Sequence, residues 1–410
     1  MKYGLIGEKL GHSFSKEIHE MLGNKEYEIV EIPKDELGDF MLKKDFKGIN
    51  VTIPYKEKVI PYLDFISSEA KDMGAVNTIV NVDGKLYGYN TDFYGLRDLI
   101  MTNNMSLTGR KVLILGTGGT CKTAECVCRS LGASKILKVG RKAKEGVLTY
   151  DQKDKFKDVD YVINTTPVGM YPNTDDIPID PGLFLKLRGV VDVIYNPLKT
   201  KLVIRTTKLG VSACNGLYML VSQAVKSSEL FMGKSYPYGT TQKLYRAVYM
   251  DKLNIVLTGM PGSGKTTVGK MLAKKLNKEF IDLDDYFEEK NGMSAGDYIK
   301  KYGENQFREA ESVVVAETST RTGCVIATGG GAVLRAENVE KMKINGRIYF
   351  LNRSLEKLQP TDDRPLSSSY DSLKMRYNER IAIYRSTADS IIPGDGTVEE
   401  TADRIYNLAR

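Results

Sequence analysis

A phosphate-binding loop stands in the second half of this chain. Residues 259–266 read G-M-P-G-S-G-K-T, after an apolar run at 254–258 and before a helix-like run at 266–276. In that setting the loop amides surround the phosphates of a nucleotide, Lys265 reaches the β and γ oxygens, and the Thr266 hydroxyl is a ligand for Mg²⁺. We therefore predict an ATP site formed by Gly259, Gly262, Gly264, Lys265, Thr266 and Thr267.

A glycine-rich turn of a different kind lies far upstream. Gly116-Thr-Gly-Gly119 follows the apolar run 111–115 and precedes a predicted helix near 120–131. Glycines in such a turn let the backbone approach a pyrophosphate at the start of a helix. The turn therefore predicts a dinucleotide site that includes Gly116, Gly118 and Gly119.

The end of the next predicted strand indicates which dinucleotide this is. Enzymes that take NAD usually place an acid there to hold the ribose 2′-hydroxyl, but residues 139–144 read V-G-R-K-A-K. Arg141 can bind a 2′-phosphate through its planar fork, and Lys142 adds positive charge. The sequence therefore favours NADP.

Hydroxyls, amides, one lysine and one aspartate gather in four short segments of the first hundred residues. These segments are 11–19, 48–56, 75–78 and 88–92. Two serines in the first segment are two residues apart and share a face if that segment is extended. Such a collection of groups suits a small polyhydroxylated acid as ligand.

These segments are similar to those of the shikimate dehydrogenases, which reduce 3-dehydroshikimate with NADPH. The likeness continues through 164–170, 192–197 and 216–223 and covers nearly all of residues 1–245. It implies a catalytic pair, Lys56 and Asp92, in which the lysine stabilises charge on the ketone oxygen and donates the proton. It also implies a cofactor contact at Gly216 and substrate contacts at Ser13, Ser15, Asn50, Thr52, Asn77, Asp92, Tyr195 and Gln223.

Groups suited to a polyhydroxy-acid acceptor follow the phosphate-binding loop. Asp282 and Asp284 are two apart at a predicted strand end, which places both on one face. Arginines in the segments 307–311 and 380–385 could bind a carboxylate of the acceptor. Together with the loop, these residues describe a kinase that phosphorylates a small hydroxylated acid.

This set resembles shikimate kinase across about residues 252–410. The resemblance implies that Asp284 binds the acceptor hydroxyls and takes a proton, and that Asp282 joins Thr266 in the Mg²⁺ shell. It assigns the acceptor's carboxylate to Arg308 and Arg380 and its ring to Gly329, Gly330 and Gly331. Residues 359–369 lack periodicity and are rich in Pro and Ser, so we predict a mobile lid there, with Arg364 reaching the transferring phosphate.

Short apolar strands that alternate with amphipathic helices must position these groups, and they predict parallel α/β sheets throughout. The expected fold class is α/β: a two-lobed dehydrogenase followed by a P-loop kinase domain with a parallel sheet. The dehydrogenase spans 1–249, with an α/β substrate lobe at about 1–104 and 216–249 and a Rossmann NADP lobe at about 105–215. The kinase spans 250–410.

Composition narrows the class of protein further. The 410 residues carry a formal charge of +7, yet the basic residues form no runs with interleaved aromatics, which argues against nucleic acid as a partner. No apolar run is long enough to span a membrane, and no signal peptide is visible. Five scattered cysteines favour a reducing cytoplasm. Only two histidines are present, which excludes a multi-histidine metal site.

The two halves together predict a bifunctional enzyme with small-molecule substrates, because the product of the first reaction is the acceptor of the second. One alternative is a quinate-type dehydrogenase joined to a related sugar-acid kinase. Another is a metabolite-sensing regulator that has lost turnover, although the residues for both reactions are present. The oligomeric state stays open.

Overall fold

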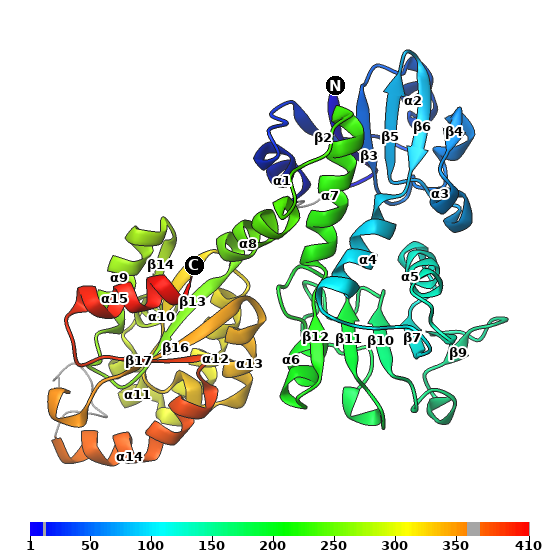
Figure 1. The fold of residues 1–410 in the computed structure, drawn as a ribbon. Helices are drawn as coiled ribbons and strands as arrows, with labels where there is room; N and C mark the ends of the chain where they lie inside the picture. The colour runs from blue at the N-terminus through cyan, green and yellow to red at the C-terminus, as the bar shows by residue number, and fades with distance from the viewer. Residues whose placement is uncertain (11–13, 359–369, 410) are drawn as a thin grey trace. The chain divides into compact units, whose positions relative to one another are not determined.

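The computed structural model describes residues 1–10, 14–358 and 370–409. The chain divides into two compact units. The first unit comprises Met1–Asn196 and Thr200–Val248, and the second comprises Pro197–Lys199 and Tyr249–Arg410. Each unit has its own sheets and its own buried clusters of hydrophobic side chains, so each is described by itself (Figure 1).

The first sheet of the first unit has the strand order β2-β1-β3-β5-β6-β4. Strand β1 pairs in parallel with β2 and β3, whereas β5 is antiparallel to both β3 and β6. The strands are β1 (Tyr3–Gly7), β2 (Tyr27–Glu31), β3 (Gly48–Val51), β4 (Phe65–Ile66), β5 (Thr78–Val82) and β6 (Lys85–Tyr89).

The expectation of parallel sheets throughout is therefore wrong for this sheet. A two-residue turn, Asp83-Gly84, joins β5 to β6, and both residues have positive φ, +51° and +80°. Two left-handed residues form the tight turn that matches the twist of an antiparallel hairpin. An Asp-Gly pair between two apolar runs is a hairpin signal that could have been found in the sequence.

The second sheet of the first unit confirms the predicted Rossmann lobe. Its order is β12-β11-β10-β7-β8-β9, and every pair in it is parallel. Buried apolar side chains cover both of its faces, in two separate clusters. Its strands are β7 (Lys111–Leu115), β8 (Lys135–Gly140), β9 (Leu148–Thr149), β10 (Tyr161–Asn164), β11 (Gly189–Asp192) and β12 (Ser212–Cys214).

Helices α4 (Thr91–Thr102) and α7 (Leu217–Met232) lie side by side between the two sheets of this unit (Figure 1). Gly95 permits this close packing, because a Cβ there would press against the carbonyl of Met219. The remaining helices of the unit are α1 (Ser15–Met21), α2 (Leu37–Lys43), α3 (Ser68–Met73), α5 (Gly119–Ser130), α6 (Lys201–Lys208) and α8 (Thr240–Lys252), the last of which runs into the second unit.

The second unit contains one five-stranded parallel sheet, as predicted, with the order β14-β15-β13-β16-β17. Its strands are β13 (Asn254–Thr258), β14 (Glu279–Asp282), β15 (Cys324–Ala327), β16 (Gly346–Asn352) and β17 (Ser390–Pro393). Its helices are α9 (Lys265–Leu276), α10 (Leu283–Asn291), α11 (Ala295–Tyr302), α12 (Glu304–Ser319), α13 (Ala336–Asn345), α14 (Tyr370–Thr387) and α15 (Val398–Leu408).

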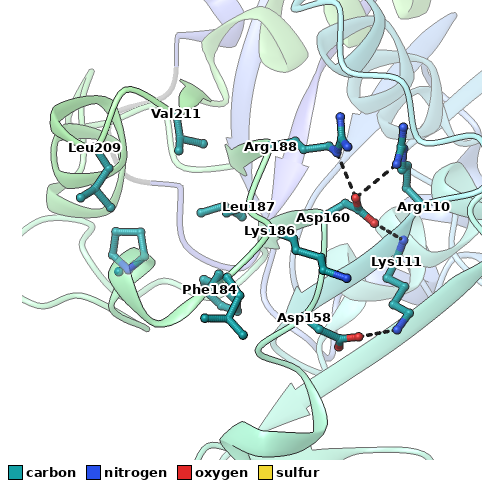
Figure 2. A pocket seen from close by; sticks show the side chains of 13 residues that line it. Arg110, Lys111, Asp158, Asp160, Phe184, Lys186, Leu187, Arg188, Leu209 and Val211 are labelled. Atoms are coloured by element: carbon teal, nitrogen blue, oxygen red, sulfur yellow. Dashed lines mark hydrogen bonds and ion pairs between the residues drawn. The ribbon is translucent and has the colours of Figure 1, made fainter.

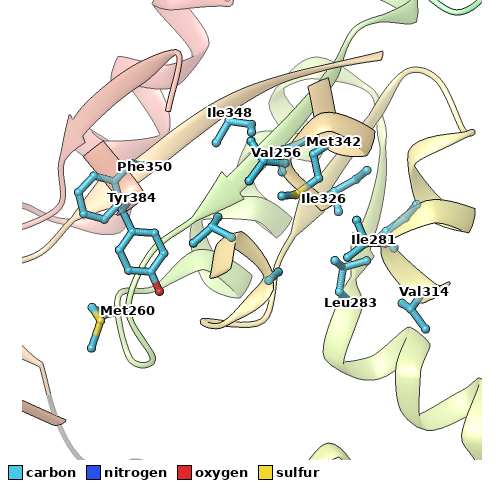
Figure 3. Close-up of a cluster of buried hydrophobic side chains, with 14 of the residues drawn as sticks. Val256, Met260, Ile281, Leu283, Val314, Ile326, Met342, Ile348, Phe350 and Tyr384 are labelled. Atoms are coloured by element: carbon cyan, nitrogen blue, oxygen red, sulfur yellow. The ribbon is translucent and has the colours of Figure 1, made fainter. Parts of the chain in front are cut away.

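Apolar side chains from the sheet and its helices fill the core of the second unit (Figure 3). Val256, Ile326 and Ile348 project from three neighbouring strands and are at most 2% exposed. Tyr384 of α14 stacks on Phe350 of β16, with ring centroids 5.0 Å apart. This packing anchors the end of α14 beside the carboxyl ends of the strands, where ligands of parallel sheets bind.

No described helix is long and apolar enough to cross a membrane. The five cysteines are free thiols.

Candidate active sites

The first unit contains a hollow of about 230 Å³ beside the paired helices α4 and α7. Its lining draws on the first sheet, on α7 and on the turns that follow β7 and β11. Eight of the residues predicted from sequence to form the dehydrogenase site line it together: Ser15, Asn50, Thr52, Lys56, Asn77, Asp92, Tyr195 and Gln223.

Lys56 and Asp92, which the sequence predicts to be the catalytic pair, form an ion pair in this hollow. The ammonium lies 2.6 Å from a carboxylate oxygen, and the two side chains are 27% and 19% exposed. Asp92 stands in the first turn of α4, where its backbone N–H donates to the side chain of the capping residue Asn90. The backbone of Lys56 is fixed by the N–H of Val76, which donates to its carbonyl. The pair is thus held by backbone contacts on both sides.

Two buried asparagines beside this pair are oriented by protein partners. Asn50 accepts from the Tyr27 hydroxyl at 2.7 Å and donates to the Thr78 hydroxyl at 3.1 Å. Asn77 accepts from the backbone N–H of Thr91 at 2.7 Å. Because these bonds decide which end of each amide carries the oxygen, the hollow presents a defined pattern of donors and acceptors.

The remaining lining residues differ in how the structure holds them. Ser15 is the first residue of helix α1, so the condition under which the two serines would share an extended face is not met at Ser15. The Tyr195 ring packs against Phe14 at 5.5 Å, and burial raises the pKa of the Tyr195 phenol. The Gln223 amide donates to the carbonyl of Leu220, one turn earlier in α7. Ser13 lies outside the described residues.

The dinucleotide turn of this unit leaves open space in front of its glycines. Gly116 has a φ of +110°, and a Cβ there would lie 2.7 Å from the Thr165 hydroxyl. A Cβ on Gly118 or Gly119 would meet no atom within 4 Å, and both residues are exposed at the start of α5. The turn therefore fits the pyrophosphate of a dinucleotide, which needs room and unpaired N–H groups.

Two further predicted cofactor positions border the same lobe. Arg141 and Lys142 follow β8 and are exposed, and neither has an ion-pair partner among the residues that the structure describes. Gly216 borders the hollow, where a Cβ would overlap the carbonyl of Val193. Glycine is thus required at 216 for close approach of two backbone segments.

Sequence reasoning missed a buried carboxylate behind this site. Asp192, at the end of β11, is fully buried and accepts hydrogen bonds from the Asn164 amide at 3.0 Å, the Ile194 N–H at 3.1 Å and the Thr200 hydroxyl at 2.6 Å. Burial raises its pKa to about 6, against the effect of these bonds. The carboxylate ties the ends of β10 and β11 to the turn that carries Tyr195.

In the second unit, glycines shape the phosphate-binding loop between β13 and α9. Gly259, Gly262 and Gly264 have φ values of +150°, +77° and +89°, where a side chain would be strained. The Lys265 ammonium donates to the carbonyls of Gly259 and Met260, each at 3.0 Å. The loop therefore curls around its own lysine, and a bound phosphate would compete with these carbonyls for the ammonium.

Thr266, the next residue after Lys265, contacts the carboxylate of Asp282 at the end of β14. Thr266 donates its hydroxyl to Asp282 at 2.7 Å, and Thr267 is exposed in the same turn of α9. Asp282 caps α10 by accepting the N–H of Asp284. Asp284 therefore lies in the first turn of a helix, and the expectation that it shares a strand face with Asp282 is wrong.

The pair formed by Thr266 and Asp282 fits a Mg²⁺ ion. Among the described residues, no three His, Cys, Asp or Glu side chains gather where they could hold a metal on their own. Mg²⁺ is commonly held by one or two protein oxygens together with phosphates and water. A hydroxyl and a carboxylate 2.7 Å apart beside a phosphate loop supply those protein oxygens.

The guanidinium of Arg308, on α12, lies against the glycine run 329–331. A Cβ on Gly331 would overlap its guanidinium, and one on Gly329 would lie 3.0 Å from Asp284. Arg308 pairs with Glu311 at 2.7 Å, a contact that sequence reasoning missed although the two residues are spaced for one helix face. Burial raises the pKa of Glu311, and the charge of Arg308 opposes that rise.

Arg380 of α14 completes this arrangement. Its side chain is buried, burial lowers its pKa, and it donates to the carbonyl of Gly330 at 3.2 Å. The Tyr384 hydroxyl, also missed, donates to Gly330 and to Gly259 and so links the glycine run to the phosphate loop. The structure thus brings Asp284, Arg308, Arg380 and the loop together. Arg364 and its predicted lid lie outside the described residues.

A larger hollow of about 850 Å³ lies elsewhere in the first unit, at the amino ends of β7, β10 and β11 (Figure 2). Its charged wall is internally paired: Asp160 is bound by Arg110 at 3.5 Å and by Arg188 at 3.1 Å, and Asp158 pairs with Lys111. It contains none of the predicted site residues. Ligands of parallel sheets bind at the carboxyl ends of the strands, so we assign the chemistry to the smaller hollow.

Comparisons with known proteins cover both units. Residues 5–79 match the family model of the shikimate dehydrogenase substrate-binding domain, and residues 261–410 match that of shikimate kinase. The chain is 40% identical over 261 residues to a shikimate dehydrogenase (NADP(+)) of Clostridium beijerinckii, a match that covers 59% of this chain and 96% of the relative.

Solved structures give the same result for the first unit. One is a chorismate mutase/shikimate 5-dehydrogenase fusion protein from Clostridium acetobutylicum, with 34% identity and a TM-score of 0.57 over 60% of this chain and 96% of the other. Another is shikimate dehydrogenase 1 from Peptoclostridium difficile, with 36% identity and a TM-score of 0.55 over 60% and 98%.

Proposed function

The chain belongs to the shikimate dehydrogenase family and carries a shikimate kinase domain, and on that premise we propose that it catalyses two consecutive reactions. The first unit reduces 3-dehydroshikimate to shikimate with NADPH. The second transfers a phosphoryl group from ATP to shikimate and forms shikimate 3-phosphate. The observation that carries the proposal is the Lys56–Asp92 pair, 2.6 Å apart in a hollow lined by hydroxyls and amides.

The reduction needs a proton donor at the ketone oxygen. NADPH supplies the hydride, and negative charge develops on that oxygen as the hydride arrives. The Lys56 ammonium stabilises this charge and donates its proton, while Asp92 keeps the ammonium in place and accepts a hydrogen bond from a neighbouring substrate hydroxyl. Asn50 and Asn77, fixed by Tyr27 and by Thr91, orient the other hydroxyls.

The preference for NADPH is assigned to the exposed cations after β8. We expect Arg141→Ala to raise the KM for NADPH about tenfold or more and to leave the KM for NADH nearly unchanged, because only NADPH carries the 2′-phosphate. Steady-state kinetics with both cofactors measure this. Lys135→Ala, which removes a cation at the opposite end of β8, is the control. Equal effects of Arg141→Ala on both cofactors would overturn the assignment.

The phosphoryl transfer needs a positioned acceptor and a stabilised phosphate. Asp284 binds the acceptor hydroxyl and takes its proton, and Arg308 and Arg380 hold the acceptor's carboxylate. Glu311 keeps the Arg308 guanidinium in the pocket. Lys265 would exchange its loop carbonyls for phosphate oxygens of a bound nucleotide, and Thr266 with Asp282 would hold Mg²⁺, which would offset the charge of those phosphates.

The proposal is tested one half-reaction at a time on the intact chain. With 3-dehydroshikimate we expect NADPH oxidation, and with shikimate and Mg-ATP we expect ADP release. Quinate in the reverse direction distinguishes the quinate-type alternative, which predicts faster NADP⁺ or NAD⁺ reduction with quinate than with shikimate. Absence of both half-reactions, with ligands still bound, would instead indicate a metabolite sensor.

A further inference from the structure

Arg353 lies directly beside the phosphate-binding loop and was assigned no role by its sequence motif. It follows the last residue of β16, the strand that pairs with β13 up to Thr258, where the loop begins. A Cβ built on Gly264 would lie 3.9 Å from the Nη1 atom of Arg353, and this is the nearest atom to that position. The guanidinium therefore stands next to the loop residue that precedes Lys265.

Arg353 also carries a donor without an acceptor. Its Nε atom is buried, and none of the described residues accepts a hydrogen bond from it. A guanidinium has its donors in a fixed, planar fork. Burying a donor without an acceptor is unfavourable, so this atom favours an anionic or polar ligand beside the guanidinium.

The backbone around Arg353 is held so that the side chain stays in this place. The N–H of Gly394, just after β17, donates to the carbonyl of Asn352 at 2.9 Å. Asp395 accepts from both the N–H and the hydroxyl of Ser354, at 2.9 and 3.1 Å. Two strand ends are thus tied together at Arg353. Asp395, beside this junction, is hydrogen-bonded by Ser354, and the Ser354 N–H chiefly, with the charges of Lys357 and Arg353, lowers its pKa.

We propose that Arg353 binds a phosphate group of the nucleotide, as a second cation beside Lys265. The proposal rests on the nucleotide site of the kinase half and extends it by one residue. A nucleotide triphosphate carries several negative charges, and the fork of a guanidinium binds two phosphate oxygens at once, which an ammonium cannot do. The position of Nη1 beside Gly264 places that fork on the side of the loop that faces β16.

The test is calorimetric titration of the intact protein with ADP, ATP and adenosine. Arg353→Met removes the charge and keeps an apolar stem of similar length, and Arg353→Lys keeps the charge without the fork. Arg321→Met is the matched control, because it removes an exposed arginine that pairs with Glu279 at the other edge of the same sheet. The thermal unfolding of each variant, followed by circular dichroism, reports whether the second unit is folded.

We expect Arg353→Met to weaken ADP and ATP about 10- to 100-fold, as for loss of a charge-assisted hydrogen bond. Arg353→Lys should recover part of the affinity, and adenosine binding should not change. Unchanged ADP affinity in Arg353→Met, or an equal loss in Arg321→Met, would overturn the proposal. So would an equal loss of adenosine, which would place Arg353 on the base and not on a phosphate.

These outcomes are separable from failure of the proposed reaction. If the wild type binds ADP but does not phosphorylate shikimate, the function of the second unit is wrong while the role of Arg353 is still decided by the titrations. If the wild type phosphorylates shikimate and Arg353→Met binds ADP normally, the proposed role of Arg353 is wrong while the proposed function of the second unit stands.

Discussion

At the scale of residues, each unit holds a charged side chain against an opposite charge within its site. Lys56 lies 2.6 Å from Asp92 in the first unit, and Arg308 lies 2.7 Å from Glu311 in the second. In both cases the partner fixes the cation in position before substrate arrives. Such preorganisation lets the cation act on developing or bound charge without further rearrangement.

Lys56→Met should lower the kcat for 3-dehydroshikimate reduction by about 10²-fold or more, because the proton donor is lost. Shikimate phosphorylation by the same variant should match the wild type, since the second unit is untouched. Both rates are measured on one preparation, by NADPH absorbance and by ADP release. Lys58→Met, a nearby exposed lysine, serves as control. Near-normal reduction by Lys56→Met would remove this residue from the mechanism.

Asp284→Asn should stop phosphoryl transfer to shikimate while ATP still binds, because the carboxylate lies near Gly329, to which we assign the acceptor. We expect a fall in kcat of about 10²-fold or more, and an ATP affinity within a few-fold of the wild type by calorimetry. Asp285→Asn is the neighbouring control on the exposed side of α10. Collapse of ATP affinity with intact shikimate affinity would place Asp284 on the nucleotide side.

At the scale of elements, the two carboxylates that we propose to be catalytic, Asp92 and Asp284, stand in the first turn of a helix. Asp92 begins α4 behind the cap Asn90, and Asp284 begins α10 behind the cap Asp282. Sequence reasoning identified the residues but placed Asp284 on a strand, because the apolar run before it suggested that the strand continued. The cap rule, in which Asp or Asn accepts the N–H two residues later, gives the correct reading.

The Lys56–Asp92 site and the hydrogen-bond network around Asp192 were predictable from the sequence to different degrees. Motif glycines and charged residues carry their chemistry in short segments, so the loops and most lining residues were found. The network around Asp192 was not, because its partners Asn164 and Thr200 lie 28 and 8 residues away and only the folded sheet brings them together. Local patterns do not encode such long-range pairing.

Asp192 gives a prediction for stability as a function of pH. Its folded pKa is about 6, above its ordinary value of 3.8, chiefly because it is buried. Between pH 4 and pH 6 the unfolded chain has released a proton that the folded chain still holds, so stability falls as pH rises through this window. The fall is on the order of 2 kcal/mol.

Asp192→Asn should lack this fall, and calorimetric unfolding of the intact chain at pH 4, 5, 6 and 7 measures it. Asp154→Asn, an exposed carboxylate in the same lobe, should keep the wild-type slope. If Asp192→Asn and the wild type lose stability in parallel across the window, Asp192 does not gain a proton in the folded chain there, and the raised pKa is contradicted.

At the scale of the whole molecule, each unit has its own buried core and its own residues predicted to form a site, with two sheets in the first unit and one in the second. We propose the domain boundary at 249/250, one residue after the division between Val248 and Tyr249 that the two units show. Linking two enzymes raises the local concentration of one site near the other but does not by itself form a channel.

Residues 1–249 and 250–410, expressed separately, should therefore each fold and keep their own activity. Mixed at equal concentration, they should approach the steady-state overall rate of the intact chain. The measurement is the rate of shikimate 3-phosphate formation from 3-dehydroshikimate. A folded kinase half that is inactive until the dehydrogenase half is added would show that the halves depend on each other.

The central claim is that one polypeptide performs both reactions in sequence, and a single incubation tests it. The purified chain is mixed with 3-dehydroshikimate, NADPH, ATP and Mg²⁺, and the products are identified by mass spectrometry. We predict shikimate 3-phosphate in the full mixture, shikimate alone when ATP is left out, and unchanged 3-dehydroshikimate when NADPH is left out. Lys56→Met should block the first step, so that 3-dehydroshikimate stays unchanged. Asp284→Asn should block the second step, so that shikimate accumulates. If the full mixture yields no shikimate 3-phosphate, or yields a phosphorylated product without NADPH, the claim is contradicted.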